Sequence, residues 1–323
     1  MMKLSIIILS WNTKELLKQC LESVISYQLP VTGEKKKLIT DNRSLITEII
    51  VVDNGSTDGS VEYLRSVIRD QLPVTGEKKK PITDNRSLIT IKQIENKENL
   101  GFSKGNNIGI KAATGKYIML LNSDTIVKEG ALKKMIDYLD AHPEVDIIGP
   151  KLLNFDRTLQ ANCGRFPGLL VSAIMLFGEH WRTNRFVRWS PKKSGFVDWL
   201  MGAAFIARRE VFDKIGGLDE RIFMYMEEVE WFYRAKKAGF KAYFLKEAEI
   251  VHLGRGSSKS GKKEPILNIY RGLLHYYRQH RSPFSLLILR FMLKMKAAIA
   301  LAIGYLKKDS YLKETYAEAI KIN

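Results

Sequence analysis

Apolar runs alternate with amphipathic segments over the first half of the chain. Uninterrupted apolar runs are typical of strands buried on both faces, and apolar residues spaced three or four positions apart indicate helices. This pattern predicts strands at 4–9, 48–53, 91–95 and 117–122 and helices at 13–27, 58–69, 102–113 and 128–141. Strands that alternate with helices predict an α/β fold, with a mostly parallel sheet covered by helices on both faces.

A stretch of twenty residues occurs twice in this region. QLPVTGEKKKLITDNRSLIT at 28–47 returns at 71–90 with one change, Leu38 to Pro81. Solenoid repeats usually need three or more stacked copies, and these two are rich in turn-forming and charged residues. Removing both copies leaves helix-to-strand connections of ordinary length. We interpret the copies as surface insertions into one domain; a functional repeat is the alternative.

Polar motifs follow the predicted strands, where α/β sheets bind ligands beyond the carboxyl ends of their strands. The first strand leads into SWNTKE rather than a glycine-rich dinucleotide loop, and the second into Asp53-Asn54-Gly55. Taken one at a time, such motifs are explained equally well as turns and helix caps. The candidate ligand-binding residues at these ends are Ser10, Trp11, Asp53, Asn99, Gly101 and Asn106.

Two further positions have side chains that can hold a cation. Asp124 ends the sequence Asn122-Ser123-Asp124 after the fourth predicted strand, and His252 ends the apolar run AEIVH. A lone Asp at such a place is more often a helix cap, and a lone His is usually structural. A divalent cation that binds a diphosphate needs a carboxylate here, so a metal role for His252 depends on its lying beside Asp124.

The segment MEEVEWFYR in the second half is acidic and aromatic. On a helix, Glu227, Glu230 and Arg234 share one face, while Glu228 points elsewhere. A solvated acidic face is the simplest interpretation of these residues alone. The apolar and aromatic neighbours argue instead that some of the carboxylates are buried, and a buried Glu with a raised pKa is suited to act as a general base.

Taken in order, these motifs resemble the inverting nucleotide-sugar glycosyltransferases of family 2, which have the GT-A fold. The rhamnosyltransferase-like branch, which builds bacterial surface polysaccharides, is the most similar. Apart from the two insertions, the resemblance covers about 3–260. It depends on the strings SIIILSWN, IIVVDNGSTDGS, NLGFSKGNN, GKYIMLLNSDT, WLMGAAFIARRE, GGLDERIFMYMEEVEW and VHLGRGSS.

The resemblance implies a role for each candidate. The nucleotide base would be bordered by Ser10, Trp11 and Asp53, and the rest of the nucleotide pocket lined by Asn99, Gly101 and Asn106. Asp124 and His252 would hold Mg²⁺ or Mn²⁺ against the diphosphate. Glu228 would be the catalytic base, with Glu227 beside it.

Two departures from the family pattern affect these roles. Asn122 replaces the first acid of the D-x-D motif, so we place it among the cofactor-binding residues and expect weak metal binding. The usual Glu-Asp pair is Glu227-Glu228 here, so either Glu remains open as the base.

The implied reaction moves a sugar, with dTDP-rhamnose as a candidate donor, to a lipid-linked saccharide acceptor with inversion. A catalytically inactive, membrane-docked module that binds nucleotide-sugars or saccharides is the alternative from another class. A nucleotidyltransferase of the same fold type is disfavoured, because SWNTKE replaces the glycine-rich phosphate loop.

Composition changes this picture mainly at the C-terminus. The 323 residues are 45% hydrophobic and 27% charged, as in a folded protein, and two cysteines form no disulfide framework. These cysteines and the lack of a signal sequence favour the cytoplasm. The net charge is +17, and from Gly254 onward 14 Lys or Arg face 4 Asp or Glu. Such a tail is suited to an anionic partner.

The apolar content of the tail favours a membrane over nucleic acid. Residues 284–306 are long enough to span a bilayer, but Arg290, Lys294 and Lys296 lie near the middle. Each costs about 2.5–3.5 kcal/mol at the bilayer centre. We therefore expect an interfacial helix, with a buried core helix and a span as alternatives. The predicted organisation is a GT-A domain at 1–260 and a basic, helical tail at 261–323 that holds the enzyme on the inner leaflet of the cell membrane. Nothing in the sequence indicates an oligomeric state.

Overall fold

A computed structural model of the chain describes residues 3–26, 47–71, 89–178, 184–254 and 263–322. Nearly all of both twenty-residue copies lies outside these ranges, so the interpretation as insertions stays a prediction. Their C-terminal ends are described and belong to the sheet. Thr47 begins β2 (Thr47–Asp53) and Ile89 begins β3 (Ile89–Glu95), so the copies extend a little into regular structure.

The predicted α/β architecture is confirmed. The large sheet has the strand order β3-β2-β1-β4-β11-β6-β12-β5, and β9 pairs with β12. Strands β3, β2, β1 and β4 are mutually parallel, while β11 is antiparallel to both of its neighbours. Besides β2 and β3, the large sheet contains β1 (Leu4–Ser10), β4 (Tyr117–Asn122), β5 (Thr125–Val127), β6 (Ile147–Leu153), β9 (Gly195–Val197), β11 (Ala204–Arg208) and β12 (Ala242–His252).

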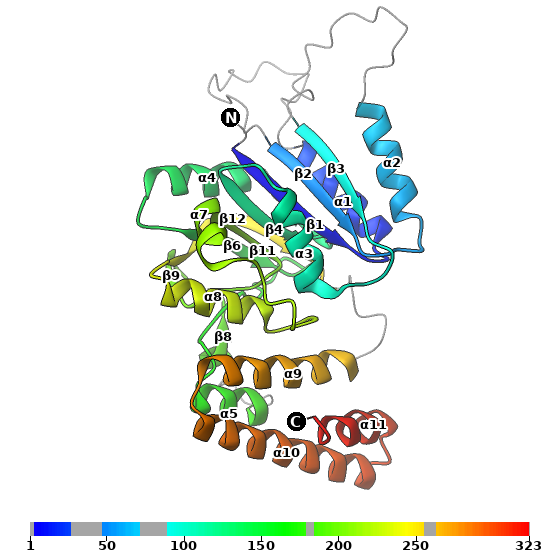
Figure 1. Cartoon of the computed structure of the whole chain (residues 1–323), viewed down its shortest axis with the longest axis vertical. Coiled ribbons are helices and arrows are strands. Elements are labelled where there is room, and N and C mark those ends of the chain that lie inside the picture. Colours follow the sequence, from blue (N-terminus) through cyan, green and yellow to red (C-terminus); the bar gives the residue numbers. More distant parts are fainter. Residues whose placement is uncertain (1–2, 27–46, 72–88, 179–183, 255–262, 323) are drawn as a thin grey trace, which may run out of the picture.

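Helices cover both faces of this sheet (Figure 1). The first four are α1 (Lys14–Ser26), α2 (Ser60–Gln71), α3 (Gly101–Ala112) and α4 (Ala131–Ala141). The helix predicted from 128 begins three residues later, because Thr125–Val127 pairs with the end of β12 as a short strand. Sequence periodicity gave no signal for so short an element.

Alternate residues of the buried strands supply two separate cores. Ile7 of β1 belongs to the cluster that also contains Phe205 and Trp231, whereas Ile6 and Ile8 belong to the cluster on the other face. This is why the strand can be apolar throughout, as the sequence is. A smaller sheet with the order β10-β7-β8 consists of β7 (Cys163–Gly164), β8 (Arg188–Trp189) and β10 (Trp199–Leu200).

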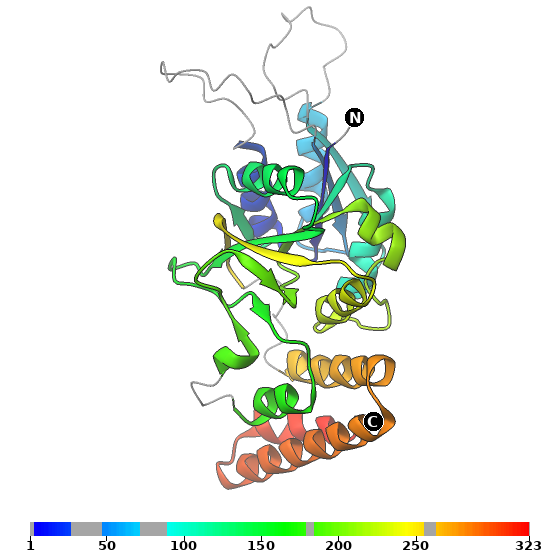
Figure 2. The ribbon, with the colours of Figure 1, turned by 90° about the vertical axis from the view of Figure 1, so that its left-hand side faces the viewer.

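The C-terminal helices form a layer below the sheet (Figures 1 and 2). These are α9 (Lys263–His280), α10 (Pro283–Leu306) and α11 (Ser310–Ala319), and they are joined by α5 (Leu169–Phe177) from the middle of the chain. A hydrogen bond of 2.9 Å between Ser172 Oγ and Tyr277 Oη links α5 to α9. The layer is therefore built from the predicted tail together with a segment of the preceding domain.

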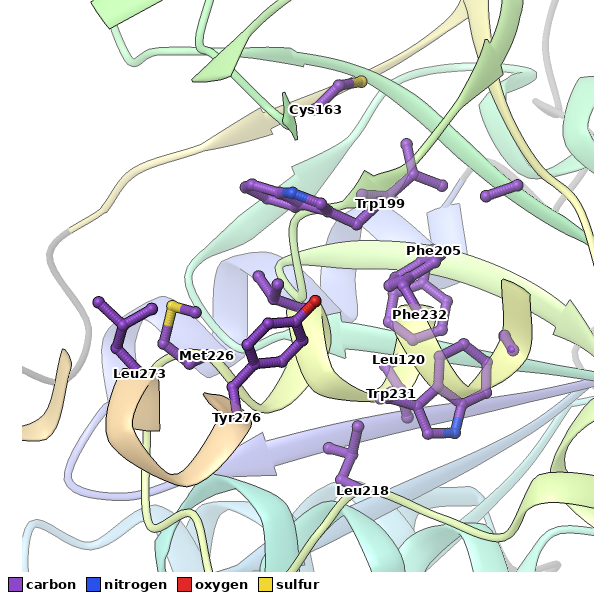
Figure 3. Close-up of a cluster of buried hydrophobic side chains, with 14 of the residues drawn as sticks. Leu120, Cys163, Trp199, Phe205, Leu218, Met226, Trp231, Phe232, Leu273 and Tyr276 are labelled. Atoms are coloured by element: carbon purple, nitrogen blue, oxygen red, sulfur yellow. The ribbon is translucent and has the colours of Figure 1, made fainter. Parts of the chain in front are cut away.

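The layer is attached through α8 (Glu227–Lys237) by a continuous apolar cluster. Figure 3 shows Leu273 and Tyr276 of α9 beside Met226 at the start of α8. A Cβ atom at Gly272 would lie only 2.7 Å from the backbone oxygen of Tyr225, so only glycine permits this approach. The remaining helices are α6 (Asn184–Val187) and α7 (Arg209–Ile215).

Helix α10 buries one face and exposes the other. Leu289 and Leu293 are buried, and Phe291 between them is exposed. In the described part of the chain, no helix has both the length and the apolar character needed to cross a bilayer. The alternative of a wholly buried core helix does not agree with the exposed face.

Candidate active site

A pocket of about 730 Å³ lies where β1, β2, β4 and β12 end. The lining includes six of the residues that the sequence singled out: Trp11, Asn99, Gly101, Asn122, Asp124 and His252. These residues come from distant parts of the chain, and the parallel strands bring them to one edge of the sheet. The sequence analysis did not predict the roles of Thr13, Gln160, Arg188 and Tyr225, which also line the pocket.

Asp124 and His252 form a pair on the pocket wall. Asp124 Oδ1 lies 3.3 Å from His252 Nε2, and both side chains are buried. Gln160 Oε1 is 2.8 Å from His252 Nδ1, so the Gln amide accepts the Nδ1 proton and orients the ring. Nε2 then faces Asp124 Oδ1 and lies 3.5 Å from Asn122 Nδ2. This is the arrangement that orients a metal-ligating histidine, with its second nitrogen held by a neighbouring acceptor.

Asp124 and His252 fit a divalent cation, although they would supply only two of its ligands. Carboxylate oxygen and imidazole nitrogen are both ordinary metal ligands. Across the described ranges, no group of three or more His, Cys, Asp or Glu gathers around one point. Asp124 and His252 would therefore supply two ligands, and the remaining positions suit phosphate oxygens and water, as Mg²⁺ prefers.

Hydroxyl groups support the same wall from behind. Ser10 Oγ lies 3.0 Å from Thr13 Oγ1, which lies 3.0 Å from Ser123 Oγ next to Asp124. Ser10 is buried and does not line the pocket, whereas Thr13 does. The structure thus places Ser10 in the support of the pocket floor.

Asp53 lies at the end of β2, directly behind the pocket. Its Oδ1 accepts a hydrogen bond of 2.8 Å from the Ser56 amide. Its Oδ2 is buried with no hydrogen-bond partner among the described residues. A buried carboxylate oxygen without a donor is costly. Asp53 itself does not line the pocket, so a role at the nucleotide base stays a prediction. Its neighbour Asn54 lines the pocket and donates to Asn99 and Gly101.

The start of α3 contributes Gly101 and Phe102 to the pocket lining. Gly101 has a φ of +83°, and a Cβ there would lie 2.6 Å from Phe223, so glycine is required. Asn106 is buried one turn later, where its amide donates to the backbone oxygen of Phe102 at 2.9 Å. Asn106 does not line the pocket.

Glu227 and Glu228 begin α8 close to the pocket, although neither is among the residues that line it. They follow Tyr225 and Met226, which both have positive φ, and Tyr225 lines the pocket. The Oε2 atoms of both glutamates are buried and lack hydrogen-bond partners among the described residues. A solvated acidic face is therefore the wrong description of this segment, because Glu227 and Glu230 are buried and Glu228 has a buried carboxylate oxygen.

Burial raises the pKa of both glutamates. The pKa of Glu227 rises well above its usual value because of burial and then because of the charge of Glu228. Burial also raises the pKa of Glu228, but N–H groups at the helix start and Gly202, together with the cation of Arg188, oppose the rise. Burial thus favours the protonated form of both groups, and the N–H groups and the Arg188 cation oppose this effect at Glu228.

Arg188 is one of the pocket residues that the sequence gave no reason to select. It lies on β8, with Nε donating to the oxygen of Ala161 at 3.0 Å and Nη2 lying 2.9 Å from the sulfur of Met201. Burial lowers the pKa of Arg188, and the charge of Glu228 raises it. Only the fold of the intervening segment brings this cation near Glu228.

The sheet and its helices have the arrangement of the GT-A fold. Solved structures of S. aureus TarS agree: the complex of TarS 1–349 with UDP-GlcNAc has a TM-score of 0.55 at 15% identity, covering 98% of this chain and 79% of TarS. The sequence model of glycosyl transferase family 2 matches residues 5–229. The chain belongs to this family, as the motifs indicated.

Two of the relatives that the chain resembles are named rhamnosyltransferases. The N-acetylglucosaminyl-diphospho-decaprenol L-rhamnosyltransferase of Mycobacterium tuberculosis H37Rv is 26% identical over 232 residues, which cover 65% of this chain and 68% of that enzyme. Rhamnosyltransferase WbbL of Escherichia coli K12 is 23% identical over 167 residues, covering 50% of this chain and 63% of WbbL.

Proposed function

We propose that this enzyme transfers a sugar from a nucleoside-diphosphate donor to a lipid-linked saccharide, with inversion, in cell-surface polysaccharide synthesis. The sugar proposed is rhamnose, with dTDP-rhamnose as donor. The M. tuberculosis relative is named for a decaprenol-diphosphate acceptor, and a Shigella flexneri relative, 26% identical over 194 residues, is named a dTDP-rhamnosyl transferase. The supporting observation in the structure is Glu228 Oε2, a buried carboxylate oxygen near the pocket with no hydrogen-bond partner among the described residues.

In the proposed reaction, the acceptor hydroxyl attacks the anomeric carbon from the face opposite the diphosphate. Glu228 takes the hydroxyl proton while the new C–O bond forms and the bond to the diphosphate breaks. Attack from the opposite face inverts the anomeric configuration. Asp53 Oδ2 would accept an N–H of the nucleotide base, and Asn54 and Asn99 would fix the edge of the pocket.

Asp124 and His252 are the residues that would hold Mg²⁺ or Mn²⁺. Such a cation, when bound, neutralises charge on the departing diphosphate. Gln160 keeps His252 Nε2 directed at the site, so its part in the reaction is to position the histidine.

The test uses the purified full chain with a panel of sugar nucleotides. Thermal shift with and without Mn²⁺ should select one donor, and NMR of the transfer product should show the anomeric configuration opposite to that of the donor. Asp124→Asn should remove the Mn²⁺-dependent shift, while the exposed control Asp156→Asn should keep it. A product with retained configuration contradicts the mechanism. Donor binding without hydrolysis or transfer would instead support the inactive binding module.

A further inference from the structure

Helix α10 carries a continuous apolar stripe on its exposed side. Leu287 is 62% exposed and Phe291 is 67% exposed, which is unusual for side chains of this size. At 3.6 residues per turn, steps of three and four residues keep such positions on one face. The exposed large apolar residues along the helix are Phe284, Leu287, Phe291, Met295, Ile299, Ile303 and Leu306.

The opposite side of α10 is already in contact with the protein. Leu289, Leu293 and Ala297 are buried where α10 packs on α9, α5 and α11. The stripe therefore faces away from the helical layer, and α10 is the element farthest from the sheet in both ribbon views (Figures 1 and 2).

Cations border the stripe on both sides. By helical geometry, Arg290 and Lys294 fall on one flank and Lys296 on the other, and the helix contains no acidic residue. Long basic side chains beside an apolar face let a helix lie flat at a bilayer surface, because their stems stay in apolar surroundings while their charges reach the headgroups.

We propose that the exposed face of α10 is a membrane-docking surface that lies parallel to an anionic bilayer at the level of its headgroups. The proposal deepens the proposed function, since a lipid-linked acceptor is held at a membrane surface. The docking step itself needs neither donor nor acceptor and can be measured without them.

Charge makes a bilayer a better occupant of this face than a second copy of the chain. Two copies joined through the stripe would bring Arg290, Lys294 and Lys296 of each together with no acid on either helix, in a protein whose net charge is already +17. Anionic headgroups would neutralise the same cations.

A second pocket lies between this layer and the transfer site. Its volume is about 420 Å³, and it shares Trp11, Asn99, Met224 and Tyr225 with the first pocket. Its other wall includes Glu264, Pro265, Asn268 and Arg271 from the first half of α9, the helix that packs against α10. A saccharide on a lipid at the docking surface would therefore approach the donor along α9.

The test is sedimentation of the full chain with sucrose-loaded vesicles of phosphatidylcholine, with and without phosphatidylglycerol. Wild type should pellet with the anionic vesicles. The double variant Leu287→Ser/Phe291→Ser should lose at least about tenfold in partitioning, because two large apolar side chains no longer enter the bilayer. Phe155→Ser, an equally exposed aromatic outside the helical layer, should behave as wild type.

Circular dichroism and thermal unfolding should be unchanged in the double variant, because both side chains are exposed. Equal pelleting of the wild type and double variant would overturn the proposal, as would failure of the wild type to pellet. A vesicle-free dimer that the double variant converts to a monomer would show that the stripe is a protein interface. Transfer to a short-chain, detergent-soluble acceptor separates the two proposals: its absence contradicts the transferase function and leaves the vesicle result standing.

Discussion

Two groups of buried carboxylates lie within one turn of α8, and their environments are opposite. Glu227 and Glu228 at the helix start have Oε2 atoms with no hydrogen-bond partner among the described residues, and burial raises the pKa of each. Glu230 is also buried, yet its carboxylate lies 2.9 Å from Arg234 Nε and 2.9 Å from His280 Nε2. Burial alone would raise the pKa of Glu230, but the hydrogen bonds from His280 and Arg234 outweigh it and lower the pKa.

This difference distinguishes carboxylates suited to catalysis from carboxylates that hold α9 against the sheet domain; we call the second group the joint. Asp219 repeats the pattern of Glu230: His275 of α9 lies 2.8 Å from its carboxylate, and hydrogen bonds from Arg221 and His275 lower its pKa despite burial. The paired carboxylates thus attach α9 to the sheet domain. Glu227 and Glu228 each keep one carboxylate oxygen without a partner among the described residues, which suits them to accept a proton from a substrate.

The largest expected effect comes from Glu228→Gln. Removing the proposed base should lower kcat by at least ~10² while the fold is kept, since general-base catalysis commonly contributes that much. Steady-state transfer assays measure it, with thermal unfolding as the check on folding. If Glu228→Gln turned over normally and Glu227→Gln were inactive, the roles assigned to the two carboxylates would have to be exchanged.

Glu230→Gln is the matched substitution at the joint. Loss of the charge that faces Arg234 and His280 should lower the free energy of unfolding by about 1–3 kcal/mol, with kcat close to wild type. Because the pKa of Glu230 is lowered, the ionised form stabilises the fold above the unfolded pKa, and this stabilisation is lost as the pH falls through the folded value. Urea unfolding at several pH values measures both effects. A large loss of kcat without loss of stability would remove the distinction between site and joint.

Arg188→Met tests what keeps Glu228 ionised. Without this cation the pKa of Glu228 should rise further, so the acid limb of the kcat/KM profile should move to higher pH and the rate at pH 7 should fall about tenfold. Arg65→Met removes a surface ion pair with Glu95 and serves as the control. An unshifted acid limb in Arg188→Met would show that the N–H groups alone stabilise the carboxylate.

The smallest effect concerns stability at alkaline pH. Because the pKa of Glu227 is raised by folding, its stabilising contribution is complete below the unfolded pKa and is lost as the pH rises through the folded value. A glutamine at position 227 does not ionise, so Glu227→Gln should be more stable than wild type at pH 8 by roughly 1 kcal/mol. This difference in the free energy of unfolding, the gap, should close at acid pH. Thermal unfolding across this range measures the gap, and a gap that is constant with pH contradicts a buried, protonated Glu227.

The sequence determined the parts of the protein whose signal is local. Runs such as that of β1 must be buried on both faces, so their order predicted the α/β sheet. A motif at the end of one run indicated Asp124, and the acidic, aromatic segment MEEVEWFYR indicated the two glutamates. The short strand β5 gave no such signal, because it has too few residues to show an alternation of apolar and polar positions. Arg188 gave none either, because it lies in no recognisable motif.

Only the tertiary structure decided which neighbours these residues have. Glu227, Glu228 and Glu230 are the same residue type within four positions of one helix, and no local rule separates them. His280 comes from fifty residues downstream and Arg188 from forty residues upstream, and each alters the proton affinity of a carboxylate only because the fold brings it within reach. Likewise, the apolar pattern of α10 showed that one face must be buried, and the packing of α5, α9 and α11 decided which face stays exposed.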